Sequence, residues 1–118
     1  MSNFKKTTVD MSASRTELHD LLNLTGSEVS INNLPAGAKV PFVHIHKKNE
    51  EVYGVLAGKG FMNIDGEDIA LNAGDWLRVD PSAKRQLRAA EDSAITVLCI
   101  QAQAGSLADY SLTDGVIV

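Results

Sequence analysis

Apolar residues recur in short stretches along most of this chain, and turn-forming residues separate the stretches. From Glu28 onward the stretches are rich in Val, Ile and Leu, and the breaks between them recur at intervals of about ten residues. The breaks contain Gly, Pro, Asn or Asp, and they lie at 32–37, 47–50, 57–60, 65–66, 72–74 and 80–83. Short strands joined by regular turns favour an antiparallel sandwich or barrel over a parallel α/β sheet. The pattern therefore predicts an all-β fold.

The Asp65 and Gly66 pair predicts a tight β-hairpin, because a type I′ turn needs positive φ at both of its central residues. Ile64 and Ile69 would then lie on paired strands on either side of this turn. The β-branched residues at 94–101 predict a further strand late in the chain.

One short helix is predicted ahead of the strands. Residues 14–17 read Ser-Arg-Thr-Glu, the form of a capping box, in which the Ser hydroxyl and the Glu carboxylate each satisfy an unpaired backbone donor. Leu18, Leu21 and Leu22 follow at helical spacing, and Gly26 is a stop signal. These signals predict an amphipathic helix at 15–24.

Length and charge limit the classes of function. A chain of 118 residues forms one domain, which we divide into an N-terminal extension at 1–27 and a β domain at 28–118. A net charge of −4 offers no basic surface for nucleic acid or for an anionic membrane. The first residues contain no apolar run that would serve as a signal peptide or cross a bilayer, so we expect a cytoplasmic protein.

Cys99 is the single cysteine of the chain. No intramolecular disulfide can form, which agrees with a reducing compartment. Two interpretations stay open. Cys99 is either a small hydrophobic residue in the core, or a soft ligand or nucleophile in a pocket.

Candidate chemistry is concentrated at His44, His46 and Glu51. On a β-strand, side chains at i and i+2 leave the same face, so the two imidazoles can converge on one point. A loop and a new strand would then bring Glu51 to that point. Two imidazoles and a carboxylate form the ligand set of many catalytic divalent-metal sites, including the facial triad of non-haem iron.

These residues stand in a wider pattern, which runs from Gly37 through His44, His46 and Glu51 to Gly58. The pattern resembles the first motif of the cupin superfamily, with one extra residue between the first glycine and the first histidine. The resemblance implies an antiparallel jelly-roll β-barrel, the double-stranded β-helix of cupins, with a pocket for a small molecule at one mouth. It also implies a divalent metal such as Zn, Ni, Mn or Fe, and a homodimer, as small single-domain cupins tend to form.

The second cupin motif is altered in this chain. In the register that starts at Gly74, Asp80 stands at the family's proline, Ser82 at its glycine, and Arg85 at the histidine that supplies the fourth metal ligand. Arginine is always protonated, so it cannot ligate a metal and repels a cation beside it. Arg85 would therefore either form an ion pair with Glu51 or hold a carboxylate or phosphate of a ligand. Both alternatives predict a metal site with three ligands, of low occupancy or empty.

Period-2 alternation assigns further residues to the pocket and to the outer surface. Phe42 shares the face of the two histidines, and Tyr53 shares the face of Glu51, so both are candidates for the pocket wall. After Gly74, Leu77 and Val79 would face the barrel interior and Trp76 would face outward, where it marks a candidate dimer surface.

The apolar residues at 116–118 are expected to pack on the barrel or to add a strand to a neighbouring subunit.

Three functions are consistent with this sequence. The first is a binding module for an anionic or sugar-like molecule. The second is a metal-dependent enzyme of the isomerase, epimerase or oxygenase type. The third is an interaction protein that uses the face around Trp76. The altered second motif at Arg85 favours the first of these.

Overall fold

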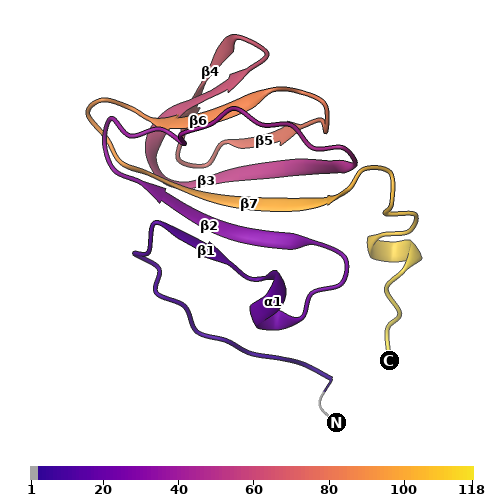
Figure 1. Ribbon diagram of the computed structural model, residues 1–118. Coiled ribbons are helices and arrows are strands. Elements are labelled where there is room, and N and C mark those ends of the chain that lie inside the picture. The colour runs from indigo at the N-terminus through magenta and orange to yellow at the C-terminus, as the bar shows by residue number, and fades with distance from the viewer. Residues whose placement is uncertain (1–2) are drawn as a thin grey trace.

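Strand β3 (Asn49–Ile64) organises the fold, because it pairs with four other strands along its length. The structure is a computed structural model that describes residues 3–118 (Figure 1). In this range the other strands are β1 (Arg15–Glu17), β2 (Glu28–Leu34), β4 (Glu67–Asn72), β5 (Trp76–Val79), β6 (Arg85–Ala89) and β7 (Ile95–Gln103). Among residues 3–118, helical residues are confined to α1 (His19–Leu22) and the 3₁₀ turn η1 (Ser111–Thr113). The predicted all-β class is confirmed.

All strand pairs are antiparallel, and their order is β1-β2-β7-β3-β4. The first half of β3 pairs with β5 and β7, and its second half pairs with β4 and β6. β3 passes from one half of the fold to the other at a β-bulge between Val55 and Ala57. The pairing path is open at β1 and β4, so the expected closed barrel is not confirmed.

The predicted hairpin at Asp65 and Gly66 is confirmed. Both residues have positive φ, 51° and 91°, as a type I′ turn requires. The turn joins β3 to β4, with Ile64 opposite Glu67 and Met62 opposite Ile69.

The predicted helix at 15–24 is wrong over most of its length. Arg15–Glu17 form β1, which pairs with Asn32, Ile31 and Ser30 of β2, and only His19–Leu22 are helical. The capping box predicted from Ser14 and Glu17 does not form, because the N-cap residue is Leu18, and the Glu28 carboxylate accepts from the backbone N–H groups of Leu18 and His19 instead. Intrinsic helix propensity is a weak signal, and pairing with a neighbouring strand overrides it here.

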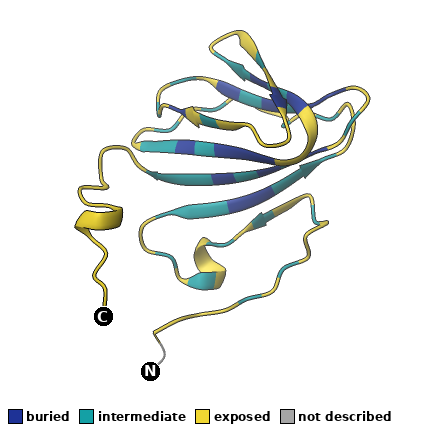
Figure 2. Ribbon diagram, turned by 180° about the vertical axis from the view of Figure 1, so that it is seen from behind, coloured by how far each residue is buried: buried dark blue, intermediate teal, exposed yellow. Residues whose placement is uncertain are grey.

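The core lies where β3, β7 and the shorter strands face one another, and Figure 2 shows the buried residues along the middle of these strands. The predicted alternation of β3 is confirmed, because Glu51, Tyr53 and Val55 are all buried. Met62 and Val97 have no exposed surface, and burial of such side chains stabilises a fold by about 1.5–3 kcal/mol each.

Trp76 faces outward as predicted, while Val79 on the same strand is buried. The Trp76 ring lies against Gly54 of the paired strand β3, where a Cβ atom would come within 2.3 Å of a ring carbon. The absent side chain of Gly54 therefore provides the space for the indole.

The apolar residues at the C-terminus do not pack on the sheet. Val116, Ile117 and Val118 are almost fully exposed, on a segment that leaves the end of β7 and extends away from the strands (Figure 1). The expectation that they pack on the barrel of their own chain is therefore wrong. Within residues 3–118, no helix is long and apolar enough to cross a membrane.

Candidate metal and ligand site

Glu51 lies at the base of the candidate site, buried on β3, with both carboxylate oxygens hydrogen-bonded. Its Oε1 accepts hydrogen bonds from the Tyr53 hydroxyl at 2.5 Å and from Arg85 Nη1 at 2.7 Å. Its Oε2 accepts one from the Cys99 thiol at 3.2 Å. Burial alone would raise the pKa of Glu51, but the donors of Tyr53, Arg85 and Cys99 outweigh it and lower that pKa. Glu51 is therefore a fixed carboxylate anion.

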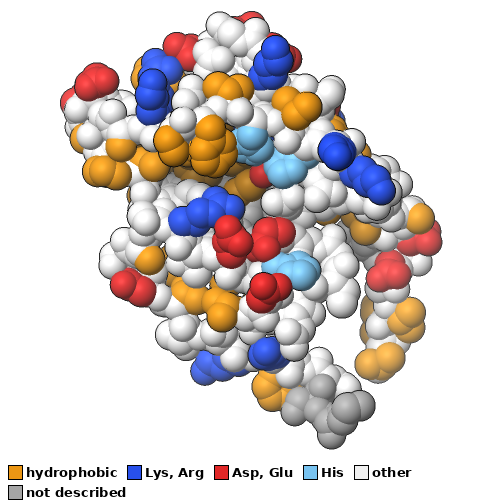
Figure 3. All heavy atoms as spheres, viewed as in Figure 1, with side chains coloured by type: hydrophobic (Ala, Val, Ile, Leu, Met, Phe, Trp, Pro, Cys, Tyr) orange, Lys and Arg blue, Asp and Glu red, His pale blue; other side chains and the backbone are white. Residues whose placement is uncertain are grey.

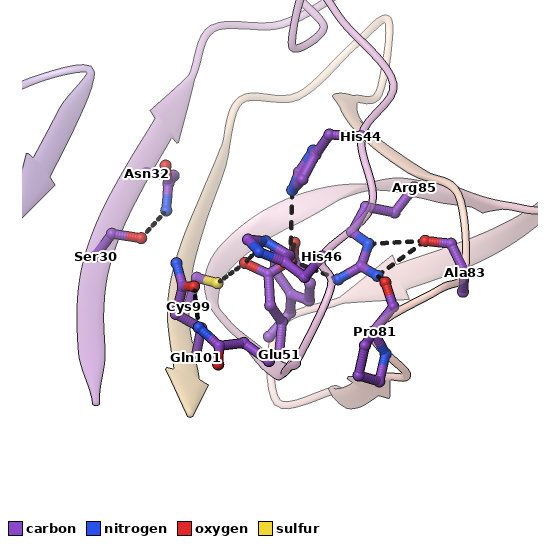
Figure 4. Close-up of polar contacts among 12 residues, drawn as sticks. Ser30, Asn32, His44, His46, Glu51, Pro81, Ala83, Arg85, Cys99 and Gln101 are labelled. Carbon is purple, nitrogen blue, oxygen red and sulfur yellow. Dashed lines mark hydrogen bonds and ion pairs between the residues drawn. The ribbon is translucent and has the colours of Figure 1, made fainter. Parts of the chain in front are cut away.

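His44 and His46 reach this carboxylate from the segment that precedes β3 (Figure 4). Backbone hydrogen bonds hold the segment against the second half of the site. His44 exchanges a pair of them with Arg85, and the His46 N–H donates to the Pro81 carbonyl at 2.8 Å. The imidazole rings lie 5.1 Å apart, close to perpendicular. The predicted convergence of the two histidines on Glu51 is therefore present.

Both imidazoles lie near Glu51 without completing their hydrogen bonds. His44 Nε2 is 3.5 Å from Oε1, and His46 Nε2 is 3.4 Å from Oε2. His44 Nδ1 and His46 Nε2 are buried, and neither has a hydrogen-bond partner among the described residues. An unsatisfied buried polar atom costs about 1–3 kcal/mol. Burial lowers the pKa of His44, with the charge of Glu51 opposing it, so this ring is neutral and able to donate a lone pair.

These three side chains fit a divalent metal. One donor atom from each of His44, His46 and Glu51 lies within 4.8 Å of the others. A carboxylate offers about four lone-pair positions. Oε1 of Glu51 already accepts two hydrogen bonds and Oε2 accepts one, so the free position is on Oε2, the oxygen nearer His46.

Arg85 forms the ion pair that was one of its two predicted roles. Its side chain is 1% exposed, and Nη1 contacts Glu51. The remaining contacts of the guanidinium go to backbone carbonyls. Nε donates to Ala83, and Nη2 lies within 2.8 Å of the carbonyl oxygens of Asp80, Pro81 and Ala83. The fork of donors that would clamp a ligand is therefore engaged within the protein.

The site opens into a cavity of about 470 Å³. All six predicted site residues line it: Phe42, His44, His46, Glu51, Tyr53 and Arg85. In the space-filling view, histidine side chains lie in a hollowed part of the surface, beside hydrophobic side chains (Figure 3). Phe42 is more than half exposed and meets the His44 ring edge-on at 5.8 Å, whereas Tyr53 is buried and contacts Glu51. The two aromatic residues thus occupy the rim and the base.

The cavity also has a wall that sequence reasoning missed. Arg15 and Glu17 of β1, Asn32 of β2 and Gln101 of β7 line it, and so does Cys99. Cys99 belongs to the buried core and its thiol also faces the cavity, so its facing is established, while a role as ligand or nucleophile stays a hypothesis. Arg15 was missed because its segment was assigned to a helix. The facing of Asn32 and Gln101 depends on the pairing of β2 with β7, which joins residues about seventy positions apart and leaves no local signal.

Comparison with known proteins identifies the family. The family profile described as "Cupin domain" matches residues 30–101, which is more than half of the chain. A cupin protein from Bacteroides fragilis of known structure is 63% identical, with a TM-score of 0.96, and the alignment covers 100% of this chain and 99% of that one. The chain belongs to the cupin family and is a small single-domain member of it.

More distant structures show the fold alone. A Cupin 2 conserved barrel domain protein from Salinispora arenicola is 16% identical with a TM-score of 0.70, and the alignment covers 87% of this chain and 92% of that one. A sugar phosphate isomerase of the cupin superfamily from Silicibacter pomeroyi is 22% identical with a TM-score of 0.66, covering 77% of this chain and 60% of that one.

A curated sequence relative from Methanocaldococcus jannaschii, named only as an uncharacterized protein, is 29% identical over 66 residues. These residues are 56% of this chain, and the match spans about half of that relative's length, 52%.

Proposed function

We propose that this cupin captures a small polar or anionic molecule in its cavity, above a three-donor divalent-metal site formed by His44, His46 and Glu51. The observation that carries the proposal is that one donor atom from each of His44, His46 and Glu51 lies within 4.8 Å of the others, while the buried His46 Nε2, 3.4 Å from Glu51 Oε2, has no hydrogen-bond partner among the described residues. A cation at this point would satisfy all three donors. A bound divalent metal would act there as a Lewis acid that polarises an oxygen of the captured molecule.

Arg85 limits how strongly such a metal is held. Its fixed positive charge lies 2.7 Å from Glu51, where it neutralises the only carboxylate of the donor set and repels a second cation. We therefore expect the Zn, Ni, Mn or Fe content to be low compared with that of a site with four protein ligands.

The direct test is metal titration of the purified protein with Zn²⁺, Ni²⁺, Mn²⁺ and Fe²⁺ after treatment with a chelator. We expect saturable binding that is lost in His46→Ala. The matched control is His19→Ala, because His19 is a half-exposed surface histidine paired only with Asp20. Absence of binding of all four ions to the unmodified protein, or equal binding by His46→Ala, would contradict the three-donor site.

A second candidate function is catalysis by the same centre, as an isomerase, an epimerase or an oxygenase. It is supported by the small number of protein donors, since three ligands leave positions free for substrate on the cavity side. Turnover of a cavity ligand that stops in His46→Ala but continues in His19→Ala would favour the enzyme over the binding module.

We also propose that the protein is a cytoplasmic homodimer that associates through the outer face around Trp76. Trp76 is 59% exposed, and Leu56 on the adjacent strand β3 is also exposed. Large exposed apolar side chains that lie near one another are typical of interaction surfaces.

A further inference from the structure

The side chains that line the cavity are positively charged in sum, although the chain as a whole carries a net charge of −4. Three lining residues are cationic, namely Arg15, Lys39 and Arg85, and two are acidic, namely Glu17 and Glu51. In a partly enclosed space, where the local dielectric constant is lower than that of water, such an excess attracts anions. The cavity is therefore complementary to a molecule of negative charge.

The buried guanidinium of Arg85 cannot be the group that receives this anion. Its donors are directed to Glu51 and to three backbone carbonyls, and the side chain is 1% exposed. Glu51 compensates its charge at 2.7 Å, and Glu17 compensates that of Arg15 at 2.9 Å, so the excess positive charge of the cavity belongs to Lys39. Arg15 differs from Arg85 because its side chain is half exposed and keeps free donors. The anion must therefore be recognised by the cations at the rim, Arg15 and Lys39.

Arg15 is already oriented for such a contact. Its Nε donates to Glu17 Oε1 at 2.9 Å, and its Nη1 donates to Asn32 Oδ1 at 2.6 Å. These bonds engage both edges of the planar guanidinium, and Nη2, which belongs to both edges, has no hydrogen-bond partner among the described residues. The side chain is half exposed, so the free donors are accessible to a ligand. Lys39 takes part in no ion pair between residues 3 and 118, but its stem is flexible and it lies exposed at the rim.

The strand register places Arg15 across the cavity from the metal donors. Arg15 and Glu17 of β1 pair with Asn32 and Ser30 of β2. Ser30 pairs with Cys99 of β7, whose thiol contacts Glu51. Strands β1 and β3 are three pairing steps apart, roughly 14 Å between backbones.

Apolar side chains also line the cavity, namely Leu34, Val40, Phe42 and Leu87. A ligand that fits the whole cavity therefore has an acid group at one end, a short carbon body, and oxygen groups at the other end.

We propose that the cavity selects small organic anions, carboxylates or phosphates on a short carbon chain with hydroxyl groups at its far end, and that Arg15 receives the acid group while the oxygens at the far end approach His44 and His46. This rests on the proposed function, since it uses the same cavity, and it assigns the recognition of the acid to a residue of β1.

The experiment uses three probes with the same three-carbon skeleton and hydroxyl groups at one end, namely glycerate, glycerol 1-phosphate and glycerol. Binding is measured by calorimetry on the full chain, before and after loading with Mn²⁺. We expect at least one of the two anions to bind, and we expect no detectable binding of glycerol. Arg15→Gln should weaken the binding of that anion about tenfold or more, which is the loss expected for one charge-assisted hydrogen bond. The anion affinity of Arg15→Lys should lie between those of the unmodified protein and Arg15→Gln, because lysine keeps the positive charge but lacks the planar guanidinium.

The matched control is Arg78→Gln, which removes an arginine of the outer face that is paired with Asp80. It should bind the probes like the unmodified protein. Preference for glycerate identifies a carboxylate ligand, and preference for glycerol 1-phosphate identifies a phosphate. The inference is overturned if glycerol binds as well as the anions, if neither anion binds at millimolar concentration, or if Arg15→Gln retains full affinity.

Failure of the proposed metal site would be seen separately. Arg15→Gln should bind Mn²⁺ as the unmodified protein does, since Arg15 lies outside the donor set. If the unmodified protein binds no metal but still binds the anion, the metal site is contradicted. The role of Arg15 is then still supported.

Discussion

Arg85 and Glu51 form an ion pair at the centre of the molecule, with 2.7 Å between Nη1 and Oε1 and side chains only 1% and 5% exposed. Removing one partner of a buried pair leaves the other charge without compensation, which costs roughly 3–5 kcal/mol. We therefore expect Arg85→Ala to lower the free energy of unfolding by roughly this amount, measured by urea denaturation.

Arg78→Ala is the control for this measurement, because its ion pair with Asp80 is more than half exposed on both sides. Surface pairs contribute about 1 kcal/mol or less. Equal losses in the two variants would show that burial of the Arg85–Glu51 pair has no energetic consequence.

Arg85→His should increase metal affinity. The substitution removes the positive charge beside Glu51 and places a potential fourth donor at that position. It also removes the contacts with the carbonyls of 80–83, so stability must be followed by thermal unfolding, with and without Mn²⁺. We expect Mn²⁺ to raise the unfolding temperature of Arg85→His by more than it raises that of the unmodified protein. A smaller rise, in a variant that is still folded, would show that Arg85 does not limit metal binding.

Cys99 should be unreactive in the native protein, although its thiol lines the cavity. The side chain is buried and donates to Glu51, and burial raises the pKa of the thiol to about 12. The thiol therefore stays protonated at neutral pH, and the thiolate is the reactive species. A disulfide reagent should label less than one-tenth of the protein in the time that labels the guanidinium-unfolded chain completely. Rapid native labelling would place the thiol in contact with solvent.

Gly54→Ala should displace the indole of Trp76. A methyl group at this position would come within 2.3 Å of a ring carbon, so the ring or the strand must shift, at a cost of about 1–3 kcal/mol. Trp76 is the only tryptophan of the chain, and its fluorescence reports the movement directly. Gly26→Ala is the matched control, because a Cβ atom there has open space. Identical emission spectra for Gly54→Ala and the unmodified protein would contradict the contact.

Mass measurement tests the homodimer. Light scattering after gel filtration should give twice the chain mass for the unmodified protein, and Trp76→Asp should shift the equilibrium to the monomer, because a charge would be buried in an apolar interface. Arg78→Asp is the control, because it changes the charge of the same outer face without removing an apolar contact. It therefore separates the effect of the added negative charge from the effect of losing the Trp76 side chain. A monomer at all concentrations would exclude the proposed interface.

The sequence predicted the grouping of the three candidate donors, because they lie close together along the chain. His44, His46 and Glu51 lie within eight residues, although only Glu51 is on a strand, and the histidines reach it from the irregular segment before β3, where a strand was expected. The role of Arg85 followed from its position in the second motif. The choice between ion pair and ligand clamp needed coordinates, because it depends on the carbonyls of 80–83 that turn toward the guanidinium.

The opposite wall could not be predicted, because it depends on pairings between distant segments. The signals at 14–22 favoured a helix, yet the edge of β2 recruits Arg15 into a strand and brings it to the cavity. The apolar residues at 116–118 were expected to pack on the barrel, but they do not contact the sheet of their own chain and are exposed. In both cases the local sequence did not indicate which other segment of the chain these residues would pair with or pack against.

Strand β1 is three residues long and has a neighbour on one side only. The wall that bears Arg15 is therefore the part of the cavity least coupled to the core. Substitutions there can change which molecule is accepted at small cost in stability, whereas the buried ion pair at the base tolerates little variation. Divergence of ligand preference among proteins with this architecture should therefore begin at the outermost strand.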